Sequence, residues 1–287
     1  MESLMMVYAN AISEQKYEEM NFWYTWCHVS DELTNSACLA CQRFELSRYQ
    51  PRNADTQRRV LTIYEVMDRD YCNRWHVKDS FTWRMRIATT LGGDFYETHW
   101  NPLWGTAHWA EYADYKGDKA VFTVKMKGRP GKGDPRDYFT EEKLREMLSM
   151  PDFHAIHFLD WHPEHQMPAN TPPPEYADYN MVGQIANCYM AANEWDRFLD
   201  AHPEIEENFE LFPAVYEPMM PRIRDADIHS RPEYRALQAV AHMIQESPEG
   251  RIFPIVPEEE KAASQPEALK EYVNIDRRSF RDDHTKC

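Results

Sequence analysis

The amino-acid sequence predicts an α+β protein in which two ferredoxin-like β-α-β-β-α-β units lie in tandem and form one intramolecular α+β barrel. The first observation is the order of strand-like and helix-like segments over 5–100, which is the split β-α-β pattern. The second is that this order returns over 119–217. A sheet of this kind carries helices on one face only, so the two open faces are expected to bury each other. We therefore expect a first barrel unit over 1–112, a second over 113–218 and a C-terminal extension over 219–287.

The elements of the first unit follow from residue periodicity and turn residues. The strand segments are rich in β-branched and aromatic residues, and the helical segments repeat apolar residues every three or four positions. Gly92 and Gly93 are expected to end the second helix, because glycine adopts the backbone conformation that often follows a helix. The expected strands cover 5–12, 37–46, 60–67 and 94–100, and the expected helices cover 17–33 and 70–91.

The second unit is interrupted by a Gly- and Pro-rich turn after its first strand and by a Pro-rich loop over 163–179. Thr140 is expected to cap a helix, since its hydroxyl can accept a hydrogen bond from a free N–H of the first turn. The expected strands cover 119–127, 152–161, 181–191 and 211–217, and the expected helices cover 141–150 and 193–207.

The chain is acidic and lacks a long apolar run, which excludes two classes of partner. Its 287 residues carry a formal net charge of -16, so a phosphate backbone is repelled and nucleic acid is not an expected partner. No stretch approaches the roughly 20 apolar residues that span a bilayer, so no membrane partner is expected. Six scattered cysteines and the absence of a secretory signal favour a cytoplasmic location.

Aromatic residues are abundant: the chain contains nine Trp, 16 Tyr and 13 Phe. Such rings can line a pocket for a flat, apolar ligand, and we expect a small aromatic substrate. The alternative interpretation is a bulky core combined with an oligomer interface, which keeps a homodimer possible.

No cofactor is expected from the motifs. The dinucleotide, phosphate-loop and serine-hydrolase signatures are absent from the sequence. Cys38 and Cys41 form a lone CxxC inside an expected strand, which is typical of core cysteines.

The expected strand over 152–161 and the residues just after it contain several histidines. His154 lies too far from His162 to share a metal ion with it, because alternate strand residues are about 6.5 Å apart. Asp160 and His162 with a remote ligand would be needed for a divalent metal, and haem is a second alternative.

Strand alternation indicates residues that face the expected cavity. Tyr8 shares a face with Asn10, and Tyr64 shares a face with Thr62. We expect these mixed polar and aromatic faces to line the cavity and the purely aliphatic faces to meet the helices. His99, in the fourth strand, belongs to such a mixed face.

Arg43 is a charged residue inside an apolar strand. A buried guanidinium needs a carboxylate partner. Glu45 or Glu65 can supply it from the chain itself; the alternative is a substrate carboxylate held by two parallel hydrogen bonds.

The segment from Phe22 to Leu33 reads FWYTWCHVSDEL, and a strand that contains Arg43-Phe44 is followed by Pro51 and by a strand from Leu61 to Glu65. These two segments resemble the EthD-like branch of the dimeric α+β barrel superfamily. That branch has Trp-Tyr, then an acidic residue and His before an apolar-Pro-Asp triplet; Cys27 and Ser30 replace its acidic residue and its proline. The matching residues are Trp23, Tyr24, His28, Val29 and Asp31. A second match is Arg43-Phe44, Pro51 and the strand from Leu61 to Glu65. The resemblance covers 5–105 well and covers 119–217 only as element order.

The resemblance implies a sheet-lined cavity with His28 at its rim. The superfamily includes cofactor-free cyclases, isomerases, dehydratases and monooxygenases, and some haem enzymes. Asp31 or Glu32 is placed to orient His28, which is a suitable proton shuttle near neutral pH.

Together these observations predict a cofactor-independent lyase, a decarboxylase or dehydratase, acting on a small phenolic compound. The expected acid–base residues are His28, Tyr64, Tyr8 and His99. The expected substrate-binding residues are Arg43, Trp26, Asn10 and Trp100. The alternatives are a cofactor-free monooxygenase or cyclase of the same superfamily, and a barrel that binds a hydrophobic ligand without turning it over.

Overall fold

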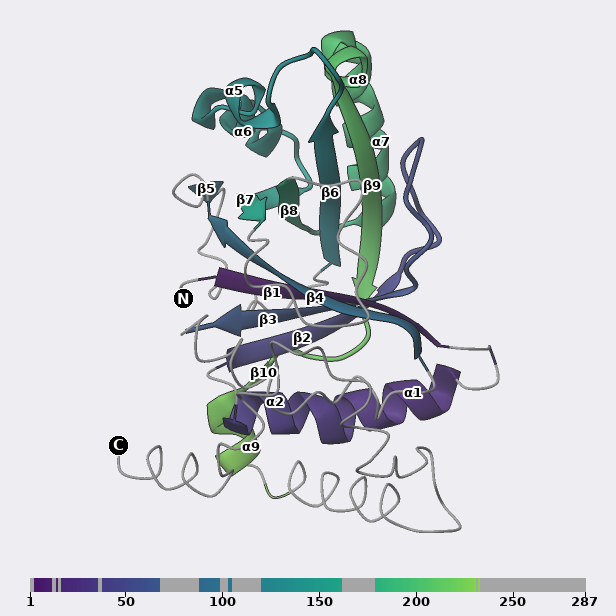
Figure 1. Ribbon diagram of the computed structural model, residues 1–287, viewed down its shortest axis with the longest axis vertical. Coiled ribbons are helices and arrows are strands. Elements are labelled where there is room, and N and C mark those ends of the chain that lie inside the picture. The colour runs from purple at the N-terminus through teal and green to yellow at the C-terminus, as the bar shows by residue number, and fades with distance from the viewer. Residues whose placement is uncertain are drawn as a thin grey trace, which may run out of the picture.

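The first half of the chain forms an antiparallel sheet covered by one long helical segment (Figure 1). The computed structural model describes residues 3–11, 14, 17–35, 38–67, 88–98, 103–104, 120–161, 179–230 and 232. The strands of this half are β1 (Ser3–Ala11), β2 (Cys38–Leu46), β3 (Val60–Val66) and β4 (Ala88–Thr98). The helical segment consists of α1 (Tyr17–Trp23), the π-helix η2 (Tyr24–His28) and α2 (Val29–Asn35).

The second half repeats this arrangement. Its strands are β6 (Ala120–Gly128), β7 (Phe153–Trp161), β8 (Tyr179–Ile185) and β9 (Phe209–Pro218), with the short β5 (Leu103–Trp104) beside β7. Its helices are α5 (Pro135–Tyr138), α6 (Glu141–Leu148), α7 (Cys188–Ala201) and α8 (Pro203–Asn208). Thr140 caps α6 as predicted, because its hydroxyl accepts a hydrogen bond from the Lys143 N–H.

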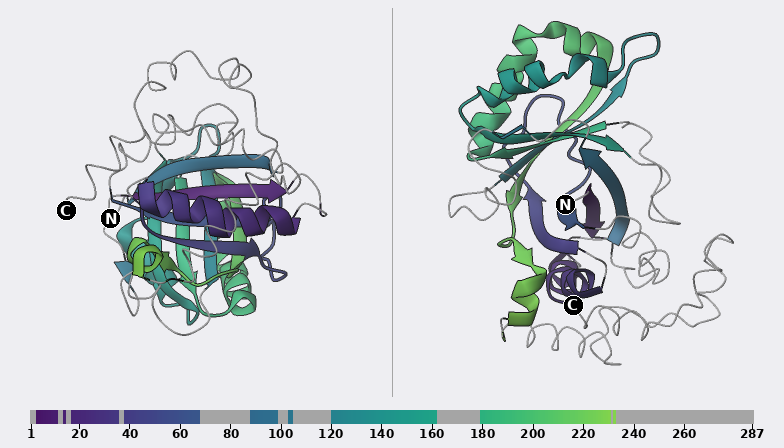
Figure 2. Two further views of the ribbon diagram at one scale, coloured as in Figure 1. Left: turned by 90° about the horizontal axis from the view of Figure 1, so that it is seen from below. Right: turned by 90° about the vertical axis from the view of Figure 1, so that its left-hand side faces the viewer.

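The two halves close into a single barrel. The strand order is β2-β3-β1-β4 in the first half and β7-β8-β6-β9 in the second, which is the same ferredoxin-like order. β4 pairs with β7, and β9 pairs with β2, so each half joins the other along both edges. The helices lie on the outer sides, and the two sheets face each other between them (Figure 2). The predicted α+β fold with an intramolecular barrel is confirmed.

The strand registers show the internal repeat residue by residue. β1 places Tyr8 opposite Leu61, and β6 places Lys125 opposite Asn180 at the corresponding position. The register of β2 on β3 shifts between Cys38 and Ala40, and that of β7 on β8 shifts between Phe153 and Ala155. These matches make Tyr8 equivalent to Lys125. In the same way, each remaining residue of the paired strands has an equivalent residue in the other half.

Three hydrophobic clusters correspond to the layers of the fold. One lies between the sheets, and the other two lie between each sheet and its helices. The cluster between the sheets contains Leu4, Met6, Tyr8, Phe44, Leu61, Ile63, Val121, Leu159, Val182, Ala214 and Tyr216. Both faces of each sheet are therefore buried, which explains why β3 and β8 are buried along their whole length.

Two predicted element boundaries are wrong. Gly92 and Gly93 do not end a helix; they lie inside β4, where they pair with Tyr8 and Val7 of β1. The strand predicted over 181–191 ends at Ile185, and α7 begins at Cys188. The local signals were ambiguous because a short apolar run fits a buried strand and a buried helix equally well. Residues 70–87 lie outside the described residues.

The start of the extension returns to the first unit. β10 (Ile223–Arg224) pairs with β2, and α9 (Asp225–Ser230) follows it; Ile223 and Ile228 belong to the core beneath α1 and α2. The domain boundaries remain a prediction, since residues 105–119 lie outside the described part. No helix in the described ranges is long and apolar enough to cross a membrane.

Residues 47–59, which we call the strap, tie the first unit to the second. The Gln50 side chain donates to the Val215 carbonyl at 2.8 Å and accepts from the Val215 N–H at 3.0 Å, as a neighbouring strand would. The Asp55 carboxylate lies 2.8 Å from the Lys125 ammonium, and these side chains are only 9% and 3% exposed. The strap thus places a buried ion pair at the junction of the two units.

Breaking this ion pair on one side is expected to destabilise the protein. Asp55→Asn leaves the buried Lys125 charge without its carboxylate, and we expect a loss of about 3 kcal/mol or more in the free energy of unfolding. Urea unfolding measures it. The double variant Asp55→Leu with Lys125→Met removes both charges and should recover most of the loss; equal stability of Asp55→Asn and the natural chain would contradict the structural role.

Candidate functional site

Arg43 of β2 is a fully buried cation under the helical segment of the first unit. Its side chain is 0% exposed. Nη1 donates to the Asn21 carbonyl at 3.1 Å and to Thr25 Oγ1 at 2.6 Å, and Nη2 donates to Asn21 Oδ1 at 2.9 Å. The guanidinium lies 4.3 Å from the centre of the Tyr24 ring. Burial in this apolar setting lowers the pKa of Arg43 below its ordinary value.

The carboxylates that the sequence offered to Arg43 bind other arginines. Glu45 accepts from Arg59 Nε at 2.8 Å. Glu65 accepts from Arg222 through two hydrogen bonds of 2.6 and 2.8 Å, and it lies on the opposite face of β3. The prediction that Glu45 or Glu65 neutralises Arg43 is therefore wrong. Among the residues that the structure describes, no carboxylate contacts Arg43, although a buried guanidinium normally requires one.

Tyr24 connects Arg43 to His28. The His28 ring meets the edge of the Tyr24 ring, with centres 4.7 Å apart and planes at 86°. His28 Nε2 lies 3.6 Å from Glu32 Oε1, and these side chains are 5% and 0% exposed. Tyr24, Thr25 and His28 all belong to the π-helix η2. Such short π-helical turns inside α-helices are frequent at functional sites.

The hydroxyl and thiol groups around Arg43 stay protonated at neutral pH. Burial raises the pKa of Tyr24 well above its ordinary value. Burial, and then the neighbouring Tyr24, raise the pKa of Tyr64. Burial also raises the pKa of the Cys41 thiol. These neutral groups can donate hydrogen bonds but do not cancel the charge of Arg43. We call Tyr24, His28, Glu32, Cys41, Arg43 and Tyr64 the Arg43 cluster.

In the described part of the second unit, the strand positions equivalent to Arg43 and Tyr64 carry no polar side chain. Strand register makes Phe158 the equivalent of Arg43 and Gly183 the equivalent of Tyr64. The Phe153 ring fills the space above Gly183, where an added Cβ would lie 3.0 Å from Phe153 Cδ1. The whole region belongs to an apolar core that includes Phe158. Because one half of the same fold is stable with apolar residues here, the fold itself does not require the polar cluster.

The structure brings together three of the residues that the sequence indicated: His28, Tyr64 and Arg43. They gather on the helix-covered side of the first sheet, where the half-buried Trp26 also packs. The prediction that the Tyr64 face of β3 lines the space between the sheets is wrong, because Leu61 and Ile63 occupy that side. Polar groups are tolerated beneath the helices because Asn21 and Thr25 supply hydrogen bonds there.

The other indicated residues lie elsewhere. Tyr8 faces the space between the sheets, as predicted; its hydroxyl accepts from Asn180 Nδ2 at 3.1 Å, and Lys125 Nζ is 4.4 Å from its ring centre. Asn10 holds the strap by donating to the Gln57 carbonyl and accepting from the Arg59 N–H. His99 and Trp100 lie outside the described residues. Catalytic and binding roles for these side chains stay predictions.

Sequence reasoning did not assign a role to Tyr24, Asn21 or Thr25. Tyr24 was visible as part of an apolar helical stripe and of the matched family segment. Nothing in the sequence indicated that residues 24–28 form a π-helix, which together with the end of α1 places these three residues against Arg43.

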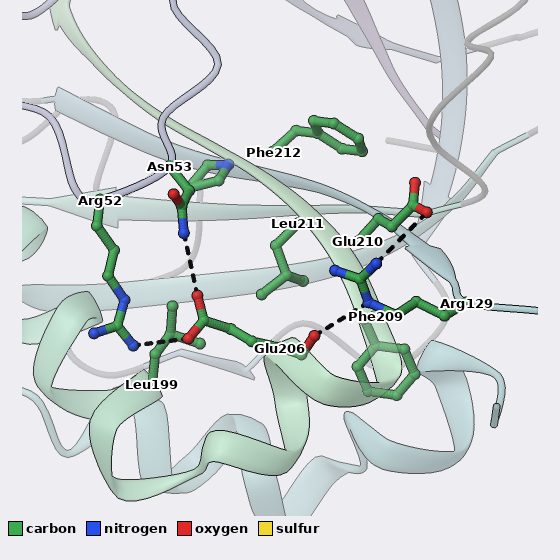
Figure 3. Close-up of a pocket in the computed structure, with 10 residues that line it drawn as sticks. Arg52, Asn53, Arg129, Leu199, Glu206, Phe209, Glu210, Leu211 and Phe212 are labelled. Atoms are coloured by element: carbon green, nitrogen blue, oxygen red, sulfur yellow. Dashed lines mark hydrogen bonds and ion pairs between the residues drawn. The ribbon is translucent and has the colours of Figure 1, made fainter.

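A separate cleft of about 440 Å³ lies between the strap, α7, α8 and β9 (Figure 3). Its charged side chains pair with one another: Arg52 lies 2.9 Å from Glu206, and Arg129 lies 3.8 Å from Glu210. Its lining residues are Arg52, Asn53, Arg129, Leu199, Glu206, Phe209, Glu210, Leu211, Phe212 and Pro213. Since its arginines already have carboxylate partners, this cleft is a weaker candidate than the Arg43 cluster.

Comparisons with known proteins support the fold. No family model matches the chain, and no curated protein matches it. Among solved structures, the chain is similar to an anthrone oxidase-like protein, with a TM-score of 0.52, 12% identity and coverage of 78% of this chain and 92% of that one. A protein described as a monooxygenase from Lactobacillus acidophilus has a TM-score of 0.45 and 10% identity, with coverage of 78% and 97%. At such identities the likeness concerns the fold alone.

The comparisons contradict the prediction that no cofactor is used. The matched structures include a heme-binding protein from Thermus thermophilus, with a TM-score of 0.40, 9% identity and coverage of 84% of this chain and 95% of that one. Matches of this kind also include a chlorite dismutase and dye-decolorizing proteins.

The described residues do not fit haem. A haem iron needs an axial ligand that faces an open slot. Two buried histidines have described side chains: His28, which lies between Tyr24 and Glu32, and His157, which is 0% exposed on the inner face opposite Val182. Both residues are almost fully enclosed by protein atoms, at 5% and 0% exposure, so neither offers an open face to a porphyrin. Within the described ranges, no group of three or more His, Cys, Asp or Glu could hold a metal ion.

His157 is expected to make the protein sensitive to acid. Burial lowers its pKa from 6.5 to about 3. Between these values the unfolded chain binds more protons than the folded one, so this stability contribution is complete above pH 6.5 and is lost as the pH falls toward 3. His157→Gln, which introduces the residue type of the equivalent Gln42, should flatten the pH dependence of the unfolding free energy by about 1.4 kcal/mol per pH unit.

Urea unfolding at several pH values between about 3 and 7 measures this slope. Gln42→Asn, at the equivalent position of the first unit, alters no titratable group and is the matched control, which should keep the slope of the natural chain. An unaltered slope in His157→Gln would show that His157 does not enter the folded core as the neutral form.

Proposed function

We propose that this chain is an oxidoreductase of the oxygenase type, which oxidises a small aromatic compound bound at the Arg43 cluster. The observation that carries the proposal is the Arg43 guanidinium: it is fully buried, stacked on Tyr24 and has no carboxylate partner in the described part of the chain. A buried positive charge of this kind is suited to a negatively charged oxygen of a ligand.

The cluster offers the groups that such an oxidation needs. Arg43 would hold an anionic group of the substrate, and the protonated Tyr64 would donate a hydrogen bond to the oxygen that gains negative charge in the reaction. His28, oriented by Glu32, would accept the proton that the substrate loses. The electron-rich anion then reacts with O2: one oxygen atom becomes a carbonyl oxygen of the product, and the other leaves as water with the two hydrogens removed from the substrate.

We prefer oxidation over the lyase reaction because of the comparison with solved structures, and not because of the residues of the Arg43 cluster. A solved structure that shares this fold with a TM-score of 0.52 is described as anthrone oxidase-like, and none of the solved structures named above is described as a decarboxylase or dehydratase. The EthD-like assignment, the cytoplasmic location and the possible homodimer stay predictions. The second candidate is a barrel that binds a ligand without converting it. All members of the Arg43 cluster are buried, and a buried cluster can hold a ligand without any reaction.

Oxygen uptake tests the proposal. With a panel of anthrone-type and hydroxylated aromatic compounds, we expect consumption of about one O2 per substrate. Arg43→Gln and Tyr64→Phe should each lower kcat/KM by about 100-fold, the scale for loss of one preorganised donor. Arg129→Lys, in the separate cleft, is the control and should retain activity. An absorbance scan of the purified protein beforehand shows whether haem is present.

The other outcomes separate the alternatives. Release of CO2 without oxygen uptake would establish the lyase instead. Saturable binding of the panel compounds with neither oxygen uptake nor CO2 release would favour the ligand-binding barrel.

A further inference from the structure

We propose that the ligand of the Arg43 cluster carries a carboxylate, which binds the Nε and Nη2 groups of Arg43 through two parallel hydrogen bonds, with one site per chain. This inference rests on the proposed function for the location of the site. It deepens that function by naming the acidic group of the substrate, and its test uses binding rather than turnover.

The count of hydrogen-bond donors on Arg43 carries the inference. A guanidinium has five N–H groups and no acceptor. Nη1 uses both of its N–H groups, on the Asn21 carbonyl and on Thr25 Oγ1. Nη2 uses one, on Asn21 Oδ1. Nε is buried and has no hydrogen-bond partner among the described residues. One N–H on Nε and one on Nη2 therefore remain.

These two donors match one particular anion. Nε and Nη2 are neighbouring nitrogens of a rigid plane, and a carboxylate presents two oxygens at the spacing of such a pair. A phenolate presents one oxygen, so it leaves a buried donor unsatisfied. The guanidinium lies against the Tyr24 ring, and Tyr24 and Tyr64 both belong to a buried hydrophobic cluster. A site lined by such rings favours a flat acid over a strongly hydrated phosphate.

Asn21 and Thr25 act as positioning residues. They lie four positions apart at the junction of α1 and η2 and bind the opposite edge of the guanidinium. Their hydrogen bonds and the Tyr24 ring together fix the plane of Arg43, so the free edge keeps one direction. A fixed orientation strengthens binding, because ordering a flexible arginine side chain when the ligand binds would cost free energy and weaken the affinity for the ligand.

The second unit predicts the number of sites. Its equivalent of Arg43 is Phe158, and the Phe153 ring occupies the region above Gly183. An acid cannot be bound there by the same donors, so the duplicated chain should bind one carboxylate and not two.

Titration calorimetry with benzoate, benzamide and phenol tests this on the full chain. We expect benzoate to bind with a stoichiometry of one per chain and at least tenfold more tightly than benzamide or phenol. Arg43→Lys keeps the charge but removes the paired donors, and it should weaken benzoate at least tenfold; Thr25→Val should weaken it severalfold. Arg52→Lys, in the separate cleft, should bind benzoate as the natural chain does.

A second measurement avoids reliance on variants that fold poorly. In 1H–15N correlation NMR spectra of the natural protein, the Nε–H signal of Arg43 should shift on addition of benzoate and not on addition of benzamide. Equal binding of the three compounds, two benzoate sites per chain, or an unchanged Arg43 signal at saturating benzoate would each overturn the inference. Benzoate binding at Arg43, together with no oxygen uptake for any compound of the oxidation panel, would uphold the carboxylate site while rejecting the oxygenase.

Discussion

Closure of the barrel is the constraint on which the rest of the structure depends. β4 pairs with β7 and β9 pairs with β2, so neither sheet has a free edge in the ring and each sheet covers the inner face of the other. This arrangement makes the space between the sheets a shared core, filled from both halves. The strap adds side-chain bonds across the same junction, including the Asp55–Lys125 pair. Buried polar side chains lie on both sides of the first sheet's core: Lys125, His157 and Asn180 lie in the space between the sheets, and the Arg43 cluster lies on the helix-covered face of the first sheet.

The two halves of the repeat have diverged on that face. Arg43 and Tyr64 lie under the helices of the first unit, whereas Phe158 and Gly183 hold the equivalent positions in the second. An aromatic core is the simpler way to stabilise this layer, because a buried charge loses its hydration. The first unit retains such a charge and surrounds it with neutral donors. We interpret the second unit as the structural partner that completes the barrel, and the first as the functional one.

Much of the fold was predictable, and the site was predictable only in part. The order of strands and helices followed from periodicity, and His28, Tyr64 and Arg43 were indicated by their chemical types. The face of β3 was assigned wrongly, because alternation shows which residues share a face but not which face meets the helices. Of the two kinds of partner that the sequence left open for Arg43, the carboxylates of the chain do not apply, since Arg59 binds Glu45 and Arg222 binds Glu65.

The sequence by itself determined the α+β class, the tandem repeat and the need for the two open faces to be buried, because these depend on local periodicity and on apolar patterning that neighbouring residues carry. The tertiary structure alone decided that β2 meets β9, that a π-helix lies over Arg43 and that its guanidinium has no described carboxylate partner. Those features depend on strand register and on contacts between residues far apart in the chain, where small differences in packing select one pairing among several that the sequence permits.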